Sequence, residues 1–342
     1  IEAASAAIRQ IRRRETLRIA IGAVLGELNI QQVSQALSQL TELYLQAMLA
    51  AIEDSIEVSD QVVLDFAIIA MGRFGGEELG FGSDADVMYV YESEGDAELA
   101  QRRAEVIVSM LKKYTSDNVL EFEIDIDLRP EGKNGAIVRS IESYENYYRR
   151  WSDTWESQAL LRARPIAGSP PLRQKFMQLI DQHRYPAELS DAALLEIRRI
   201  KARVESERLP QGADPKRHLK LGRGSLSDVE WLVQLYQLRF ANQHAAIRTP
   251  KTLEALEALV TEKLIDRHDA DVLAQAWTLA SRVRSASVLW SNKRTDVLPT
   301  DRRQLEGIAR ILEYPKGGAA MLETDYLSST RRSRTVFEKL FY

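Results

Sequence analysis

The chain has 342 residues, with 46 Lys and Arg against 50 Asp and Glu, a formal net charge of −4, 45% hydrophobic residues and no Cys. This composition is typical of a globular protein of about two domains, and the charge balance argues against a protein that binds nucleic acid over a broad basic surface. The absence of Cys excludes disulfides, Cys nucleophiles and iron–sulfur clusters, and the 4 scattered His leave carboxylates as the main candidates for metal ligands.

Nothing in the sequence predicts a membrane segment. The longest nearly apolar run, from Leu64 to Gly72, is roughly half the length that a membrane helix needs, and it contains Asp65. The chain opens at Ile1 in a charged helical pattern without a signal-like segment. We therefore expect a cytoplasmic protein without membrane contact, and the opening favours a piece excised from a longer chain.

Helical and strand patterns alternate in the first part of the chain. Over residues 3–53, apolar side chains recur three and four positions apart, which predicts helix interrupted by glycines. A β-branched run at 62–69 predicts a strand, and a second strand is expected at 87–91. The glycine-rich residues 72–82 lie between them, so two short strands should flank a glycine loop.

The most regular strand pattern comes next. Residues 98–113 have helical spacing, and from Leu120 to Arg129 apolar side chains alternate strictly with charged ones, which predicts a strand. Pro130 and Gly132 end this pattern, and residues 136–138 are expected to form another short strand.

Beyond Ser140 the strand signals stop. Apolar residues at helical spacing recur in blocks separated by Gly and Pro, and the number of these breaks predicts about six to eight helices. The predicted order is an N-terminal helical segment at 1–57, a small α/β core at 58–145 and a C-terminal helical domain at 146–342.

Carboxylates form the first functional signal. Period two places four acidic side chains on one face of the strand at 120–129, about 6.6 Å from one to the next. A partly enclosed row of like charges must take up protons or bind cations. Asp84 and Asp86 enter the strand at 87–91 from the same side, so carboxylates can converge from two strands. Oxygen ligands without His or Cys suit Mg²⁺ or Mn²⁺, as in two-metal nucleotidyl transfer. The row consists of Glu121, Glu123, Asp125 and Asp127.

The glycine loop supplies a second signal. Gly75 and Gly76 allow the backbone to approach a triphosphate with free N–H groups, and Arg73 can pair with a phosphate oxygen. Residues 80–85 also fit the loose dinucleotide fingerprint G-x-G-x-x-A, but that motif opens a helix and this one opens a strand, so we reject a Rossmann site. The loop lacks the Gly-Lys-Ser/Thr of a P-loop.

Several features have simpler structural interpretations. An isolated Asp84/Asp86 pair is more often a turn, and Glu121 and Glu123 are expected on a solvated face. The basic stretch 196–223 is more typical of a charged helix face than of a partner surface. Ser225 with Asp228 is expected to form a helix cap. Trp151 and Trp155 are expected on a core face of a helix. A solvated helix face is expected for Arg331, Arg332 and Arg334.

Five ordered motifs extend over nearly the whole chain. They are Gly72-Arg73-Phe74-Gly75-Gly76-Glu77-Glu78-Leu79, Gly82-Ser83-Asp84-Ala85-Asp86, Asp125 before Leu128-Arg129-Pro130-Glu131-Gly132, the run from Trp155 to Arg164, and the run from Lys220 to Trp231. Together they closely resemble the glutamine synthetase adenylyltransferase family, within the DNA polymerase beta-like nucleotidyltransferase superfamily.

The resemblance implies an α+β, mostly helical fold, in which a small nucleotidyltransferase mixed sheet with a glycine loop is followed by an all-α helical bundle domain. It implies that Asp84, Asp86 and Asp125 are catalytic and hold the metals. Arg73 stands where many relatives carry Lys, and Asp127 stands where many carry Arg, which leaves open whether Asp127 is a ligand, a base or a side chain that points away. The expected nucleotide-binding residues are Arg73, Gly75, Gly76, Ser83, Lys220 and Arg223.

The family combines two similar halves, one attaching AMP to glutamine synthetase and one removing it. The aromatic tail at residues 337–342 favours the C-terminal, AMP-attaching half. The expected reaction is transfer of AMP from ATP to a tyrosine of glutamine synthetase with two Mg²⁺ ions, or Mn²⁺, and release of pyrophosphate. Two alternatives stay open: phosphorolysis of adenylyl-tyrosine by the AMP-removing half, and a non-catalytic module that docks glutamine synthetase or a PII-type signal protein. No nucleic-acid partner is expected.

Overall fold

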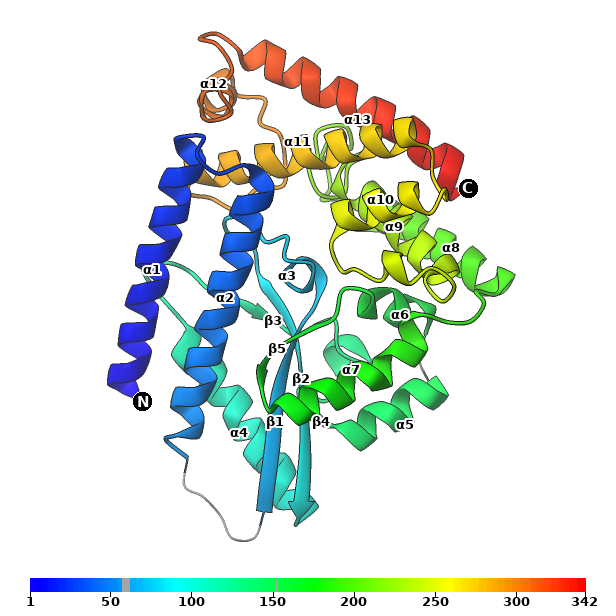
Figure 1. The fold of residues 1–342 in the computed structure, drawn as a ribbon. Helices are drawn as coiled ribbons and strands as arrows, with labels where there is room; N and C mark the ends of the chain where they lie inside the picture. The colour runs from blue at the N-terminus through cyan, green and yellow to red at the C-terminus, as the bar shows by residue number, and fades with distance from the viewer. Residues whose placement is uncertain (57–61, 152) are drawn as a thin grey trace. The chain divides into compact units, whose positions relative to one another are not determined.

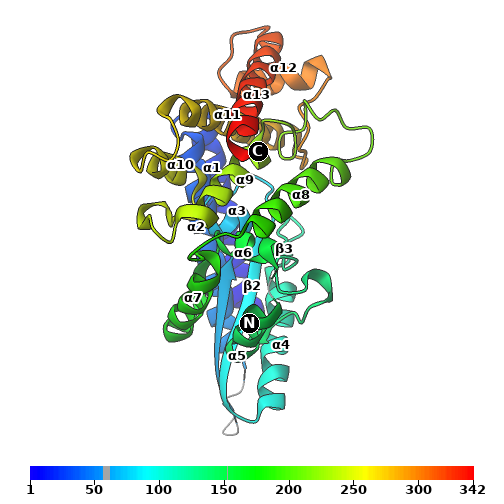
Figure 2. The same cartoon turned by 90° about the vertical axis from the view of Figure 1, so that its right-hand side faces the viewer.

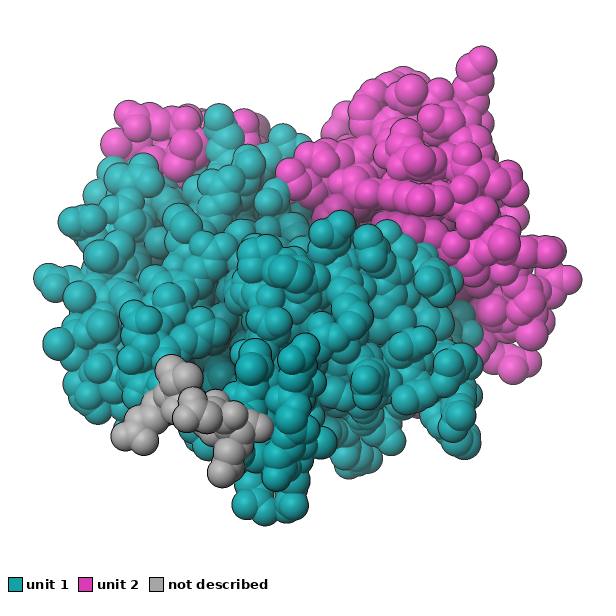
Figure 3. Space-filling view, turned by 60° about the horizontal axis from the view of Figure 1, so that its bottom comes forward, with its two compact units in different colours: residues 1–21, 31–79, 84–184 teal, residues 22–30, 80–83, 185–342 magenta. Residues whose placement is uncertain are grey.

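The computed structural model describes residues 1–56, 62–151 and 153–342. They form two compact units, coloured separately in Figure 3. Unit 1 comprises residues 1–21, 31–79 and 84–184, and unit 2 comprises residues 22–30, 80–83 and 185–342. The predicted boundary at 57/58 lies outside the described residues. The second predicted boundary, at 145/146, stays a prediction beside a structural division that falls mainly at 184/185.

A five-stranded mixed sheet forms the centre of unit 1 (Figure 1). The strands follow the order β3-β2-β1-β5, and β4 pairs with β2 beside this path. β1 is antiparallel to both β2 and β5, whereas β3 and β4 run parallel to β2. The strands are β1 (Val62–Ala70), β2 (Ala85–Gly95), β3 (Ile124–Asp125), β4 (Arg139–Ser140) and β5 (Arg164–Gly168).

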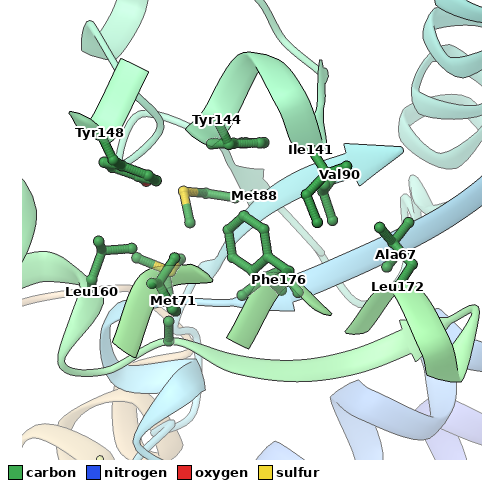
Figure 4. Close-up of a cluster of buried hydrophobic side chains, with 13 residues drawn as sticks. Ala67, Met71, Met88, Val90, Ile141, Tyr144, Tyr148, Leu160, Leu172 and Phe176 are labelled. Atoms are coloured by element: carbon green, nitrogen blue, oxygen red, sulfur yellow. The ribbon is translucent and has the colours of Figure 1, made fainter. Parts of the chain in front are cut away.

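One face of this sheet is covered by three helices, α5 (Ile141–Trp151), α6 (Thr154–Leu160) and α7 (Pro170–Arg184). Alternate strand residues such as Ile69 and Met88 point into a buried cluster with these helices, as Figure 4 shows for its labelled members. Tyr144 packs edge-on against Phe176 with ring centroids 5.1 Å apart. Alternate side chains of β1 and β2 therefore form an apolar layer on this face of the sheet.

The other face packs against α2 (Ile30–Glu53) and α4 (Ala97–Thr115), visible on the opposite side of the sheet in Figure 1. Tyr91 on β2 donates to Gln101 of α4 at 2.8 Å, and Tyr44 of α2 donates to the carbonyl of Thr115 at 2.8 Å. Asp96 caps α4 by accepting from the N–H groups of Glu98 and Leu99. Two buried faces explain why residues 66–70 of β1 and 87–91 of β2 form continuous apolar runs.

Unit 2 is a helical assembly around α9 (Leu226–Phe240), α11 (Arg267–Ser291) and α13 (Ala319–Phe341). Figure 2 shows α11 and α13 next to each other near the C-terminus. His218 and Val297 form an isolated β-bridge that joins two loops of this unit. The remaining helices are α8 (Asp191–Glu207), α10 (Thr252–Thr261) and α12 (Arg302–Ile311), while α1 (Glu2–Val24) and the single turn α3 (Gly72–Gly75) precede them in the chain.

The predicted fold class is confirmed: the protein is a mostly helical α+β chain with an N-terminal mixed sheet and a C-terminal helical region. Among residues 141–151 and 153–342, nine α-helices follow Ser140, one more than the upper expectation. Strand β5 was not expected there at all. No helix within the described ranges is both long and apolar enough to span a bilayer.

The strand expected at 120–129 is wrong for all but Ile124–Asp125. The backbone before it bonds elsewhere, because Asp117 accepts from the N–H groups of Val119 and Leu120 and Arg12 donates to the carbonyl of Leu120. After β3 the chain turns at once. The short strand expected at 136–138 is displaced to β4, at residues 139–140.

Two further expectations about single side chains are wrong. Trp151 is 71% exposed at the end of α5 and is therefore not a core residue, whereas Trp155 is half-buried. Arg334 does not lie in solvent: it is paired with Glu205 and Asp228 within unit 2.

Candidate active site

The connection between β1 and β2 begins with one helical turn, α3. Its backbone closes on itself, since the Gly75 N–H donates to Met71 at 2.7 Å and the Gly76 N–H donates to Gly72 at 3.2 Å. The expectation that Gly75 and Gly76 present free N–H groups is therefore wrong. The chain has used both donors to form the turn itself, as an α-helical turn requires.

Gly75 is instead a point of close packing. A Cβ added there would lie 1.7 Å from the carbonyl oxygen of Arg162, so no larger side chain fits without moving the backbone. The Gly75 carbonyl accepts from Arg164 at 3.2 Å. The glycine therefore allows the turn to lie directly against the backbone that leads into β5.

A buried ion pair strengthens the same contact. The side chains of Glu78 and Arg162 are 7% and 6% exposed and form a salt bridge. Arg164 adds a second pair, with Glu42 of α2 at 2.5 Å. Sequence reasoning assigned no role to these residues, although both arginines belong to the motif from Trp155 to Arg164. In the structure they join the start of β5 to the residues after α3 and to α2.

Two of the predicted carboxylates are neighbours across the sheet. Asp86 is the second residue of β2, and its register partner on the parallel strand β3 is Asp125. Directly paired residues on adjacent strands point to the same face and lie about 4.8 Å apart. Asp84 precedes β2 and shares the side of Asp86 by the period of two. All three side chains are half-buried.

Asp86 also lies against the start of α3. A Cβ added to Gly72 would be 2.4 Å from one carboxylate oxygen of Asp86, and Gly72 has a φ of +51°. The Met71 N–H donates to the Asp86 carbonyl at 2.8 Å, which ties the two segments together. Gly72 is thus needed both for its left-handed backbone and for the room that it leaves to the carboxylate.

Asp127 is not aligned with this pair. It forms ion pairs with Lys133 at 3.3 Å and Arg129 at 3.7 Å, and its N–H donates to Asp125 at 2.7 Å. Arg129 is buried and also donates to the carbonyls of Ile126 and Gly135. Sequence reasoning missed this organising role of Arg129. The expected solvated face is confirmed for the two preceding acids, which are exposed: Glu121 and Glu123.

The donor set fits a hard divalent cation in kind, because it consists of carboxylate oxygens from two adjacent strands. Within the described part of the chain, no three His or acidic side chains are already gathered as a complete ligand set. The structure thus brings Asp86 and Asp125 together and places Asp84 two residues before Asp86. The assignment of metals to these three residues stays a prediction.

The other predicted nucleotide-binding residues lie in two places. Arg73 is half-buried in unit 1 and donates to the Glu78 carbonyl at 2.9 Å. Ser83, in unit 2, accepts from the Gly80 N–H at 3.0 Å and from Arg284 at 3.4 Å. Lys220 and Arg223 are exposed on a loop of the same unit.

Two family models match the chain. Residues 1–179 match the model described as glutamate-ammonia ligase adenylyltransferase. Residues 198–341 match the model described as GlnD PII-uridylyltransferase. The first match contains the sheet and the three predicted carboxylates, and the second contains most of the helical unit.

Curated relatives are similar over almost the whole chain. The bifunctional glutamine synthetase adenylyltransferase/adenylyl-removing enzyme of Leifsonia xyli subsp. xyli is 55% identical over 342 residues, and that of Streptomyces avermitilis is 45% identical over 361 residues. Both alignments cover 100% of this chain but only 34% and 36% of the relatives. The protein of the same name from Mycobacterium leprae is 44% identical over 98% of the chain. The chain therefore spans about a third of the length of these relatives.

Proposed function

The chain belongs to the glutamate-ammonia ligase adenylyltransferase family, and on that premise we propose that it transfers AMP from ATP to a tyrosine of glutamine synthetase. Glutamate-ammonia ligase is another name for glutamine synthetase. The observation that carries the proposal is the register pairing of Asp86 with Asp125 beside Gly72. Family membership suggests the reaction class. The carboxylates of Asp86 and Asp125, called the acidic corner below, are the place where we propose that it occurs.

In the proposed reaction, the tyrosine Oη forms a bond to the α-phosphorus of ATP. The bond from that phosphorus to the oxygen bridging to the β-phosphate breaks, pyrophosphate leaves, and the phenolic proton passes to solvent. The phenol has an unperturbed pKa of about 10, so the site must favour its ionised form during attack. The product is an adenylyl-tyrosine on the protein substrate.

Asp84, Asp86 and Asp125 would hold two Mg²⁺ ions, or Mn²⁺, through carboxylate oxygens. When bound, these cations would neutralise charge on the triphosphate and favour ionisation of the attacking hydroxyl. The chain itself fixes where the carboxylates lie, because β2 and β3 pair in register and Gly72 leaves room for Asp86. A side chain at residue 72 would displace that carboxylate.

Arg73 is the proposed cation for the phosphates on the glycine-loop side. Gly75 and Gly76 contribute to nucleotide binding by shaping the turn that carries Arg73, since their N–H groups are already bonded within it. The nucleotide contacts predicted from the resemblance for Ser83, Lys220 and Arg223, which belong to unit 2, stay predictions. Asp127 is proposed to stay outside the metal set, held by Lys133 and Arg129.

Mass spectrometry of glutamine synthetase tests the direction of the reaction. Incubation of the unmodified enzyme with this protein, ATP and Mg²⁺ should add the mass of one AMP to a tyrosine-containing peptide. A parallel incubation of adenylylated glutamine synthetase with inorganic phosphate should leave the modification in place. Loss of AMP in the second reaction, with none gained in the first, would assign the adenylyl-removing reaction instead. A protein that pulls down glutamine synthetase but changes neither form would be a docking module.

A further inference from the structure

The loop after β3, residues 126–138 of unit 1, is organised around the buried side chain of Arg129. All three guanidinium nitrogens donate to main-chain carbonyls, those of Ile126 at 2.7 Å, Gly135 at 3.0 Å and Lys133 at 3.1 Å. Loop carbonyls have no strand partner, so they need donors of this kind where water is excluded. One guanidinium thus ties the start of the loop to residues that follow it by seven and nine positions.

The backbone of this loop has a costly conformation. Glu131 and Gly132 have φ values of +63° and +57°, and the left-handed region is unfavourable for a residue with a side chain such as Glu. A Cβ added to Gly135 would lie 2.0 Å from the Pro130 carbonyl oxygen, so the two ends of the turn are in close contact. Such a conformation persists only where other contacts hold it, and Arg129 supplies three of them.

One peptide group connects Arg129 to the carboxylate of Asp125. The Asp127 N–H donates to Asp125 Oδ1 at 2.7 Å, and within the described residues this is the one hydrogen bond of that carboxylate. The same planar peptide group contains the Ile126 carbonyl, which points to the opposite side and accepts from Arg129. Arg129 therefore holds the oxygen of the group whose N–H holds Asp125.

Asp125 has no cation of the protein beside it. In the described ranges it forms no ion pair with Lys or Arg, whereas Asp127 forms two. Its register partner on β2 is another acid, Asp86. Like charges on neighbouring strands repel each other, and a bound cation would relieve that repulsion. The structure thus fixes the orientation of a carboxylate whose charge it does not itself balance.

We propose that Arg129 is a positioning residue, which orients the Asp125 carboxylate for metal binding through the peptide group of Ile126 and Asp127. The inference rests on the proposed function, because it takes Asp125 as a metal ligand. Arg129 itself is no ligand, since its nitrogens donate to carbonyls and its positive charge repels a metal cation. Its contribution to metal affinity therefore comes from geometry, as for other residues that orient a ligand.

Binding of Mn²⁺ in the presence of ATP, followed by electron paramagnetic resonance, tests the proposal. Arg129→Gln should weaken Mn²⁺ binding at least about tenfold, the loss typical of a residue that orients a metal ligand. Loss of the positive charge alone would strengthen binding, so the direction of the change separates the two effects. In an Asp125→Asn background, Arg129→Gln should change the affinity by less than about twofold.

Two further variants keep the test decisive. Arg129→Lys keeps the charge but has one nitrogen in place of three, so it should weaken Mn²⁺ binding as Arg129→Gln does; wild-type affinity would overturn the proposal. Arg184→Gln is the matched control, because Arg184 is also a buried arginine of unit 1 that donates to main-chain carbonyls, those of Leu160 at 3.2 Å and Ala163 at 3.1 Å. It should lower the melting temperature and leave Mn²⁺ affinity unchanged.

Hydrogen exchange of the Asp127 amide, followed by NMR in the metal-free wild-type protein, covers the case in which the Arg129 variants fail to fold. The N–H bonded to Asp125 should exchange at least about tenfold more slowly than an exposed amide. An unprotected Asp127 amide would overturn the proposal, because Asp125 would then have no fixed donor.

Failure of the proposed function and failure of this inference give different results. Wild-type protein that binds no Mn²⁺, or a folded Asp125→Asn protein with wild-type affinity, would overturn the proposed metal site and this inference with it. Affinity that falls in Asp125→Asn but not in Arg129→Gln, or that Arg129→Gln lowers equally in both backgrounds, would overturn only the positioning role.

Discussion

Removing one partner of the Glu78–Arg162 pair should destabilise unit 1 by several kcal/mol. The two side chains are 7% and 6% exposed, so Arg162→Met leaves the Glu78 carboxylate without its buried counter-charge. Loss of one partner from such a pair costs about 3–5 kcal/mol, whereas replacing both by apolar residues of similar size is often close to neutral. Each single substitution should therefore be strongly destabilising, whereas the double substitution should be much less so.

We expect Glu78→Met and Arg162→Met each to lower the free energy of unfolding by about 3–5 kcal/mol, and the double variant to lower it by at most about 2 kcal/mol. The coupling free energy is then at least about 4 kcal/mol. Urea unfolding followed by hydrogen–deuterium exchange of peptides from β1 and β5 reports on unit 1 alone.

Arg102→Met provides the matched control. Arg102 is paired with Glu98 on the surface of α4, where the side chains are 68% and 78% exposed, so its loss should cost less than about 0.5 kcal/mol. A double variant as unstable as the sum of the two single variants would refute the reasoning, since it would mean that the buried charges do not stabilise each other.

Three other perturbations test separate features. Gly75→Ala should destabilise unit 1 by at least about 1–3 kcal/mol in the same unfolding assay, because its Cβ would lie 1.7 Å from the Arg162 carbonyl oxygen; normal stability would show that the contact is not tight. Burial opposes ionisation of Asp117, but hydrogen bonds from Arg13 and the backbone lower its pKa to about 2. The ionised carboxylate therefore contributes about 2 kcal/mol to the free energy of unfolding above pH 4, and this contribution is lost as pH falls toward 2. Asp117→Asn should therefore lose stability at pH 7 but not near pH 2 in acid titrations. Burial lowers the pKa of His218, with help from the charges of Lys220 and Arg284 and against the charge of Asp296. The free energy of unfolding should therefore fall as pH drops below about 6.5, and it should fall less in His218→Asn. Wild-type melting curves that are the same at pH 8 and pH 5 would contradict this prediction.

Local patterns in the sequence were enough to predict the central elements. The β-branched run at 62–69 and the apolar run at 87–91 became β1 and β2, because a strand buried on both faces must be apolar along its length. The position of Asp84 and Asp86 at the start of β2 followed from the same runs. The carboxylates could thus be placed at one end of the sheet before any contact was known.

The strand pattern at 120–129 misled for a physical reason. Alternation reports only which side chains are covered, and Glu121 and Glu123 are indeed exposed while Phe122 packs against Tyr44 at a centroid distance of 5.0 Å. Pairing depends on whether a neighbouring strand is available to the backbone. Here the Leu120 carbonyl and the Val119 N–H are hydrogen-bonded to the side chains of Arg12 and Asp117 instead.

The other wrong or missing predictions concern residues whose partners lie far away in the sequence. β5 is a short run containing Pro165, and its pairing with β1 can be seen only once the chain has returned to the sheet. Arg334 lies in a run of exposed-looking arginines, but the adjacent helices bring Asp228 and Glu205 to it. Charge spacing along one helix does not reveal a carboxylate supplied by another.

Binding of Mn²⁺ in the presence of ATP, followed by electron paramagnetic resonance, most directly tests whether the acidic corner holds the metals. Asp86→Asn and Asp125→Asn should each weaken Mn²⁺ binding at least about tenfold. Glu121→Gln, the same change of charge on an exposed residue of the segment before β3, should leave it unchanged. Wild-type Mn²⁺ affinity in a folded Asp125→Asn protein would contradict the account.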